Sequence, residues 1–335
     1  MTTSTLALTL GDPAGIGPEI ILKTWAALRA GGPAFMVVGD FDALASASVN
    51  GGSVVRRVTS PAEAVEVFPN AVPLLDQPLR TRVVAGQPSP AAAGAIIGWI
   101  ETAVGLALSG RVRGLVTAPI AKAPLYAAGF KFPGHTEFLG ELTATTGFDG
   151  TRGPIMMLAA PGLRVSLVTV HEPLAKASGA LSVERIVNAG LITAQALRRD
   201  FGVASPRLAV AGFNPHAGEG GAIGREEVDI VEPAVRALRA QGVEATGPWP
   251  ADTLFPEEMR ARYDAALCLY HDQALIPIKM LDFWGGVNVT LGLPIVRTSP
   301  DHGTAFDIAG RGIARPDSLI AAVRMAGEIA DRRGR

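Results

Sequence analysis

Several short segments of the chain are continuously apolar and lack the polar and apolar alternation of a half-exposed strand. Uninterrupted hydrophobicity over a few residues is typical of strands buried on both faces, as in parallel sheets. The stretches between these segments have a helical pattern, as at 183–199 and 227–240. We therefore predict an α/β fold with a mainly parallel core. The apolar segments are 6–10, 35–38, 115–116, 165–170, 208–211 and 265–270.

The composition favours a globular protein with a small partner. With 335 residues and 48% hydrophobic content, the chain can bury a large core in one large or two medium domains. The net charge is -1 and no basic tract is interleaved with aromatic residues, so we predict no nucleic-acid partner. The single cysteine, Cys268, excludes an internal disulfide, and we interpret it as a buried structural thiol.

Neither the N-terminus nor the most apolar helical segment predicts a membrane association. Residues 1–10 carry no positive side chain and run into a Gly/Pro turn, unlike a secretory signal. Segment 91–108 is rich in Ala and Gly and contains Glu101, so we interpret it as a buried or interface helix. We expect a cytoplasmic protein.

Three of the five histidines follow directly on apolar, strand-like segments. His171 follows 165–170, His216 follows 208–211, and His271 follows 265–270. Ligands of open parallel sheets bind outside the carboxyl ends of strands, so these imidazoles are candidates to converge there. Three neutral imidazoles with an open coordination position are typical of a catalytic metal site. A histidine near a strand end is also often a hydrogen-bonded structural residue, and the spacing alone leaves both interpretations open.

Two aspartates accompany these histidines. Asp272 is adjacent to His271, and Asp252 lies in "WPADTLF". Either carboxylate is suited to accept the second ring N–H of a ligand histidine, which would fix its tautomer. The alternative for Asp252 is a helix N-cap.

Residues 8–19, "LTLGDPAGIGPE", predict a strand, a Gly-rich turn and a helix that begins near Pro18. Such a turn can aim backbone N–H groups at an anion. It matches neither the dinucleotide-binding nor the Walker pattern, so a simple connector is an equal alternative.

Further candidate ligand-binding residues are polar side chains in apolar or turn contexts. His135 and Thr136 lie in the turn of "FPGHTEFL", where the alternative for Thr136 is a helix N-cap. Lys279, Asn288 and Arg297 are isolated polar residues in apolar segments. Lys and Arg together suit carboxylate and phosphate binding, although each residue taken singly is more often structural.

Seven strings occur in one order along the chain: "GDPAGIGPE", "GHTEFL", "FNPHAGEGG", "PADTLF", "YHDQALIPIK", "GVNVTLGLPIVRTSPDHGTA" and "AGRG". Through these strings the chain resembles, over nearly its whole length, the 4-hydroxythreonine-4-phosphate dehydrogenase family. The resemblance implies the three-layer α/β/α fold with two subdomains of isocitrate and isopropylmalate dehydrogenases, in a homodimer with its active site at the subunit interface. We expect an outer subdomain of residues 1–128 and 285–335 that holds the nucleotide loop. Residues 129–284 would form the inner subdomain with the metal site and the dimer interface.

The resemblance also implies a role for each candidate residue. The cofactors would be NAD or NADP and one divalent ion, Zn, Mg or Co, in each active site. His171 and His216 of one chain would bind this ion together with His271 of the partner subunit. Lys279, Asp252 and Asp272 would be catalytic. The substrate-binding residues would be His135, Thr136, Lys279, Asn288 and Arg297, and the nucleotide loop 301–316 would use Asp301, His302, Gly303 and Thr304.

The implied reaction oxidises the C3 hydroxyl of 4-phosphooxy-L-threonine with hydride transfer to NAD(P). The resulting 3-oxo acid decarboxylates to 3-amino-2-oxopropyl phosphate, a step of pyridoxal 5'-phosphate (vitamin B6) synthesis. The ion would polarise the hydroxyl, and Lys279 and Asp252 are the candidates for proton transfer. The alternatives are a 4-phospho-D-threonate or erythronate dehydrogenase and a non-catalytic metal- or phosphometabolite-binding protein. Glu172 and Ala274 depart from the family pattern, and neither is a predicted ligand.

Overall fold

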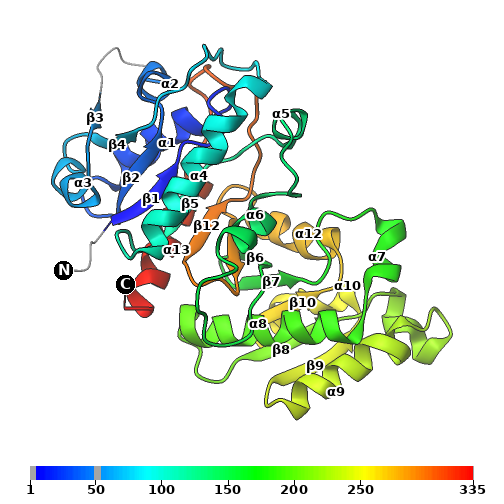
Figure 1. Ribbon diagram of the computed structural model, residues 1–335. Helices are drawn as coiled ribbons and strands as arrows, with labels where there is room; N and C mark the ends of the chain where they lie inside the picture. Colours follow the sequence, from blue (N-terminus) through cyan, green and yellow to red (C-terminus); the bar gives the residue numbers. More distant parts are fainter. Residues whose placement is uncertain (1–4, 49–53, 335) are drawn as a thin grey trace. The chain divides into compact units, whose positions relative to one another are not determined.

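The computed structural model describes residues 5–48 and 54–334 (Figure 1). The chain forms two compact units, which we call the terminal unit, Met1–Thr146 with Pro294–Arg335, and the central unit, Gly147–Leu293. It enters and leaves the central unit later than at the predicted boundaries of 128/129 and 284/285. Residues 135–142 belong to the terminal unit because they form a helix, α6, that contacts α4 there. Residues 287–291 belong to the central unit because they form a strand, β11, that pairs with β6.

The sheet of the terminal unit is entirely parallel among the described residues. Its strands lie in the order β3-β4-β2-β1-β5-β12. Leu8 of β1 lies opposite Val37 of β2 and Val116 of β5, so three of the predicted apolar segments are neighbouring buried strands. The strands are β1 (Thr5–Thr9), β2 (Ala34–Gly39), β3 (Val55–Arg57), β4 (Val72–Asp76), β5 (Leu115–Thr117) and β12 (Arg297–Pro300).

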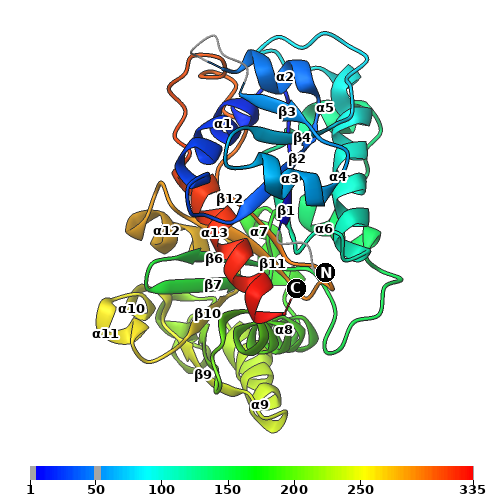
Figure 2. The ribbon, with the colours of Figure 1, turned by 90° about the vertical axis from the view of Figure 1, so that its left-hand side faces the viewer.

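Helices cover both faces of this sheet. Figure 2 shows α1 and α13 on one side of the strands and α4 on the other. Helix α4 contacts β1, β2 and β5, and α13 contacts β12, β5 and α1. The helices are α1 (Gly17–Leu28), α2 (Phe41–Ser46), α3 (Pro61–Val67), α4 (Ala93–Leu108), α5 (Lys122–Ala127), α6 (His135–Leu142) and α13 (Asp317–Arg332), with a 3-10 turn, η1, at Pro90–Ala92.

Segment Pro90–Leu108, which contains α4, is long and apolar enough to cross a membrane by length and composition alone. Half of its apolar window is buried within the structure, and Trp99 and Ile100 are almost fully enclosed. Because α4 packs against parallel strands, it is a core helix, as the sequence predicted for 91–108.

The sheet of the central unit is mixed, with four parallel strands and an antiparallel pair at one end. Its order is β11-β6-β7-β10-β8-β9, in which β7, β10, β8 and β9 are parallel. Strands β7, β8 and β10 are three of the predicted apolar segments. The strands are β6 (Ile155–Ala160), β7 (Leu163–Leu167), β8 (Arg207–Ala211), β9 (Glu244–Trp249), β10 (Ala265–Cys268) and β11 (Val287–Leu291).

Helix α12 packs against a core made of alternate residues from these strands. Leu158, Val165, Ala209 and Cys268 form this core together with Ile278 of α12. Burial raises the pKa of the Cys268 thiol, so this cysteine is the inert buried thiol that the sequence predicted. The helical elements are α7 (Leu174–Ala180), α8 (Val183–Phe201), the 3-10 segment η2 (Pro215–Gly221), the π-helical turn η3 (Glu227–Val231), α9 (Glu232–Ala240), α10 (Ala251–Leu254), α11 (Glu257–Arg260) and α12 (His271–Leu281).

Candidate functional site

His171 and His271 lie together at the carboxyl ends of two neighbouring parallel strands. His171 follows β7, and His271 is the first residue of α12 after β10. Their ring centroids are 5.9 Å apart. Both residues line a cavity of about 420 Å³ in the central unit, together with Glu172, Leu174 and other residues of the same two loops. The sequence prediction that strand ends bring these two imidazoles together agrees with this geometry.

Asp272 orients the imidazole of His271. The Nδ1 atom of His271 lies 2.7 Å from Oδ1 of Asp272, so the ring donates its Nδ1–H to the carboxylate. In the neutral ring, this bond leaves Nε2 without a proton and able to bind a metal ion. The role predicted for Asp272, acceptor of the second ring N–H, matches this contact.

His216 follows β8 but is not grouped with the other two histidines. Within residues 5–48 and 54–334, no set of three or more His, Cys, Asp or Glu side chains of one chain is placed to hold a metal ion. His216 lies in η2, whose backbone is left-handed from His216 to Gly220. The chain by itself therefore presents two close imidazoles and a third on a separate segment.

The left-handed turn of η2 includes three residues that are not glycine. The φ angles are 53° for His216, 50° for Ala217 and 44° for Glu219. A left-handed conformation costs an L-residue about 1–2 kcal/mol because Cβ approaches the following carbonyl oxygen. Strain of this kind persists only where surrounding contacts hold it, and it is concentrated at functional sites.

Asp252 lies on α10, which is beside η2. The alternative that Asp252 is a helix N-cap is wrong, because Pro250 occupies that position and Asp252 is inside the first turn. Proline is compatible with a helix start, so the N-cap lies two residues before the aspartate and the helix begins at Ala251. Asp252 is therefore on the same side of the central unit as His216, without a capping bond that would occupy its carboxylate.

A cationic cluster forms in the terminal unit around His135. Arg297 is 2% exposed, and its guanidinium donates to Oγ1 of Thr117 at 2.7 Å. Burial lowers the pKa of Arg297 to about 10, so the side chain stays charged at neutral pH. Burial, Arg297 and Lys122 together hold the pKa of His135 well below its usual value, so its ring is neutral. The side chain of Glu137 partly offsets this positive charge.

The other predicted substrate-binding residues lie on three different elements. Thr136 is in the first turn of α6, and the N-cap of that helix is Gly134, so the alternative that Thr136 caps the helix is wrong. Lys279 lies on α12, with Nζ 5.4 Å from the ring centroid of Phe283. Asn288 is on β11, and its Oδ1 atom is buried without a hydrogen-bond partner in the described part of the chain.

The Gly-rich turn 11–17 packs against the predicted nucleotide loop. The N–H of Ile16 donates to the carbonyl of Thr304 at 2.9 Å. A Cβ atom on Gly15 would lie 2.8 Å from that carbonyl oxygen, so only glycine permits this approach. A backbone hydrogen bond therefore holds the turn against the predicted nucleotide loop, and this contact leaves open both interpretations of the turn, ligand loop and connector.

Glu19 and Lys23 of α1 fix the far end of the same loop. Glu19 is 4% exposed and accepts hydrogen bonds from the backbone N–H groups of Gly312 and Ala314, at 3.2 and 2.8 Å. Lys23 bonds to Glu19 at 2.7 Å and donates to the carbonyls of Gly312 and Ala314 at 2.9 and 2.7 Å. The ion pair therefore binds both the N–H groups and the carbonyl groups of Gly312 and Ala314.

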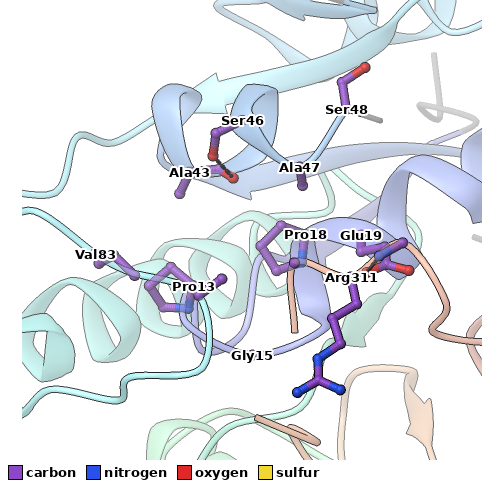
Figure 3. Close-up of a pocket in the computed structure, with 13 residues that line it drawn as sticks. Pro13, Gly15, Pro18, Glu19, Ala43, Ser46, Ala47, Ser48, Val83 and Arg311 are labelled. Atoms are coloured by element: carbon purple, nitrogen blue, oxygen red, sulfur yellow. Dashed lines mark hydrogen bonds between the residues drawn. The ribbon is translucent and has the colours of Figure 1, made fainter. Parts of the chain in front are cut away.

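A cavity of about 280 Å³ lies beside this ion pair in the terminal unit. Figure 3 shows Pro13 of the Gly-rich turn and Pro18 of α1 on one side of this cavity, and Ala43 of α2 with the following Ala47 on the other, with Arg311 nearby. Gly310 and Gly312 complete the wall from the nucleotide loop. The residues predicted for nucleotide contact, Asp301, His302, Gly303 and Thr304, do not line the cavity but precede its wall in the same loop.

Sequence reasoning missed Glu19, Lys23 and Glu227 as residues that shape these sites. The i, i+4 spacing of Glu19 and Lys23 predicts an ion pair on a helix, but not that it reaches a loop almost 300 residues later. Glu227 falls within the predicted helix 227–240, and nothing in the local pattern shows that its carboxylate points at the loop of His216.

Comparison with known proteins gives consistent matches along the whole chain. The family model described as pyridoxal phosphate biosynthetic protein PdxA matches residues 33–326. The 4-hydroxythreonine-4-phosphate dehydrogenase of Caulobacter vibrioides is 70% identical over 334 residues, covering 100% of both chains. That of Maricaulis maris is 56% identical and covers 98% of both.

Solved structures agree with these sequence matches. The crystal structure of 4-hydroxythreonine-4-phosphate dehydrogenase from Klebsiella pneumoniae has a TM-score of 0.86 at 42% identity, covering 98% of this chain and 99% of that one. This match confirms the predicted fold class, an α/β fold with two subdomains of the isocitrate and isopropylmalate dehydrogenase type.

Proposed function

This chain belongs to the pyridoxal phosphate biosynthetic protein PdxA family, and from that membership we propose that it is a 4-hydroxythreonine-4-phosphate dehydrogenase of vitamin B6 synthesis. It oxidises 4-phosphooxy-L-threonine with a nicotinamide nucleotide, NAD or NADP, and acts in the cytoplasm. The observation that carries the proposal is the imidazole of His271 at the end of a parallel strand, which Asp272 orients so that Nε2 can bind a metal ion.

The side chains at the strand ends fit a divalent metal ion. Neutral imidazole nitrogen is a common ligand of Zn, Co and related ions, and the His271–Asp272 contact is the usual outer support of a ligand histidine. We propose His171, His216 and His271 as the ligands. One chain does not group all three in its described residues, which supports a site completed by a second copy.

A second copy also accounts for exposed apolar side chains on and after α12. Ile276 and Met280, one helical turn apart, are 62% and 81% exposed, and Phe283 and Trp284 follow at 60% and 50%. A cluster of this kind on a soluble protein marks an interaction surface. Since α12 begins with His271, a homodimer through this surface would bring a neighbouring chain close to the histidine pair.

When bound, the divalent ion supplies Lewis-acid polarisation of the substrate hydroxyl, and the nicotinamide nucleotide supplies the hydride acceptor. The C3–H bond is broken with its electron pair, and the hydroxyl proton passes to a base, for which Lys279 and Asp252 are our candidates. The 3-oxo acid then loses CO₂, and the carbon that carried the carboxylate takes up a proton to give 3-amino-2-oxopropyl phosphate. Asp272 keeps His271 in the tautomer that presents Nε2.

The substrate's anionic and polar groups are assigned to the cationic cluster and its neighbours. Arg297 offers a buried, charged guanidinium for phosphate or carboxylate, and the neutral His135 offers a hydrogen bond without a second full charge. Thr136 and Asn288 supply further polar contacts. The nucleotide is assigned to the loop 301–316 and to the cavity beside Glu19 and Arg311.

The deciding experiment follows the absorbance of reduced nicotinamide with 4-phosphooxy-L-threonine and with 4-phospho-D-threonate, each with NAD and NADP. We expect turnover with the aminated substrate, loss of turnover on chelation, and recovery on adding Zn, Co or Mg. Turnover of the deaminated substrate alone would instead establish the threonate or erythronate dehydrogenase. Absence of turnover with every pairing, in the presence of metal, would indicate a binding protein.

A further inference from the structure

The left-handed turn that carries His216 is attached to one buried carboxylate. Glu227 is 1% exposed, and its Oε1 atom accepts the backbone N–H groups of Phe213 and Asn214, both at 2.7 Å. Its Oε2 atom accepts the side-chain amide of Asn214 at 2.8 Å. Phe213 and Asn214 carry the last backbone N–H groups before the left-handed turn. The carboxylate therefore holds the backbone that leads into the turn.

The turn also approaches Glu227 from its other end. Gly218, with a φ of 77°, lies so close that a Cβ atom there would be 2.6 Å from Oε2 of Glu227. After this point the N–H of Ile223 returns to the carbonyl of Gly218. The carboxylate therefore contacts the chain before His216 and packs against it two residues after His216.

A buried carboxylate needs several donors to offset the loss of water. For Glu227 these are two backbone N–H groups and one side-chain amide of residues 213–214, which directly precede the turn of His216. The neighbouring residue, Glu226, is less specific: it accepts the Asn214 amide at 2.7 Å and the Ser178 hydroxyl, and no backbone N–H of residues 213–214. The strained φ angles of His216, Ala217 and Glu219 require contacts of this kind to persist.

We propose that Glu227 is a positioning residue for the metal ion: it holds the left-handed turn and thereby fixes the imidazole of His216 in the orientation that binds the ion. This inference rests on the proposed role of His216 as a metal ligand. Glu227 does not itself touch the ion or the substrate; it acts through the backbone of residues 213–218.

The test measures Zn²⁺ affinity of the full-length purified protein by competition with a chromogenic chelator, alongside its circular dichroism spectrum and nucleotide affinity. In Glu227→Gln, an amide donor faces the Asn214 amide, so we expect about a ten- to hundredfold weaker Zn²⁺ affinity with nucleotide affinity unchanged. Glu226→Gln is the matched control and should change Zn²⁺ affinity less than threefold. An equal loss in the control would overturn the specific role of Glu227.

Two further variants separate a positioning role from a general loss of structure. Gly218→Ala disturbs the same contact from the side of the left-handed turn and should weaken Zn²⁺ binding even if Glu227→Gln does not fold. Adding Ala217→Gly to Glu227→Gln removes part of the backbone strain and should recover several-fold in Zn²⁺ affinity. Absence of any effect in Gly218→Ala, or of any recovery in the double variant, would contradict the proposal.

His216→Ala distinguishes this inference from the proposed function. If His216→Ala leaves Zn²⁺ affinity unchanged, His216 is not a ligand and the proposed metal site is wrong. If His216→Ala weakens binding while Glu227→Gln does not, the metal site stands and the positioning role of Glu227 is wrong.

Discussion

The Nδ1 atom of His271 and the Oδ1 atom of Asp272 are 2.7 Å apart, and this contact joins the first two residues of α12. Because the carboxylate accepts the ring N–H, it sets the tautomer and raises the basicity of the free Nε2 atom. The aspartate side chain is largely exposed, so solvent moderates the effect.

Asp272→Asn should therefore weaken Zn²⁺ binding by about tenfold, because an amide oxygen accepts the ring N–H without the negative charge. Competition with a chromogenic chelator measures the change. The matched control is Glu172→Gln, which removes a charge from the same cavity, where Glu172 pairs with Arg185 rather than with a histidine. Equal losses in both variants would show that only net charge matters.

The nucleotide loop should lose its shape when its ion pair is removed. In Glu19→Gln, a group that accepts two backbone N–H bonds and pairs with Lys23 loses its charge, so we expect the KM for the nucleotide to rise about tenfold. Zn²⁺ affinity should not change. Glu328→Gln, which breaks an exposed i, i+4 pair in the same unit, is the control for an ordinary helix ion pair. Unchanged nucleotide KM in Glu19→Gln would contradict the assignment of this loop.

Strands buried on both faces could be predicted from the sequence because their residues are continuously apolar, as in β2 and β10. Edge strands could not, because they carry polar residues that face solvent: β3 contains Arg56 and Arg57, and β9 is mostly partly or fully exposed. The antiparallel pair β6 and β11 was also missed, since Met and Ala in β6 do not distinguish a strand from a helix.

For the site, the end of each strand could be predicted, but the path of the chain after it could not. His171 and His271 follow short, direct connections and meet as expected. His216 enters a left-handed turn, which the glycines of "NPHAGEGG" permit but which His216, Ala217 and Glu219 do not favour, and the backbone before the turn is bound by the distant Glu227. Long-range hydrogen bonds such as that from Lys23 to Ala314 carry no local signal at all.

The half-buried, neutral His135 should make stability depend on pH. Its pKa in the folded protein is held well below the ordinary value of 6.5, so below about pH 6.5 the unfolded chain binds a proton that the folded chain does not. Stability therefore falls as the pH drops through this range, by at most about 1.4 kcal/mol per pH unit from this residue. His135→Asn should remove that part of the slope. Urea unfolding of both proteins at pH 7.5 and 5.5 measures this change in the free energy of unfolding. An equal change in the wild type and in His135→Asn would contradict the prediction.

Substrate and nucleotide binding should be separable by mutation. Lys279→Ala or Arg297→Ala should raise the substrate KM or lower turnover by about tenfold or more, because a charge-assisted hydrogen bond is lost, while nucleotide affinity stays nearly constant.

Gly303→Leu should weaken nucleotide binding and leave the substrate KM nearly constant. A Cβ atom on Gly303 would meet nothing within 4 Å, and a circular dichroism spectrum like that of the wild type would show that the variant keeps its fold. Titration of each variant with the nucleotide measures these affinities. Unchanged nucleotide affinity in Gly303→Leu would contradict the assignment of the nucleotide to this loop.

The last prediction concerns which chains supply the three histidines of one metal site. The closeness of His171 and His271 in one chain permits a site in which both come from the same subunit. We predict instead that His171 and His216 of one chain act with His271 of the partner subunit. Two inactive variants distinguish these arrangements, namely His171→Ala and His271→Ala.

In a heterodimer of the two variants, a shared arrangement places both lesions in one site and leaves the other site complete. If the arrangement keeps His171 and His271 in one chain, each site carries one lesion and none is complete. With random exchange at equal concentrations, half the dimers are mixed and half of their sites work, so mixing should restore roughly a quarter of wild-type activity. Each variant alone should be nearly inactive. If mass-tagged chains demonstrate exchange but mixing restores no activity, His171 and His271 act from the same chain.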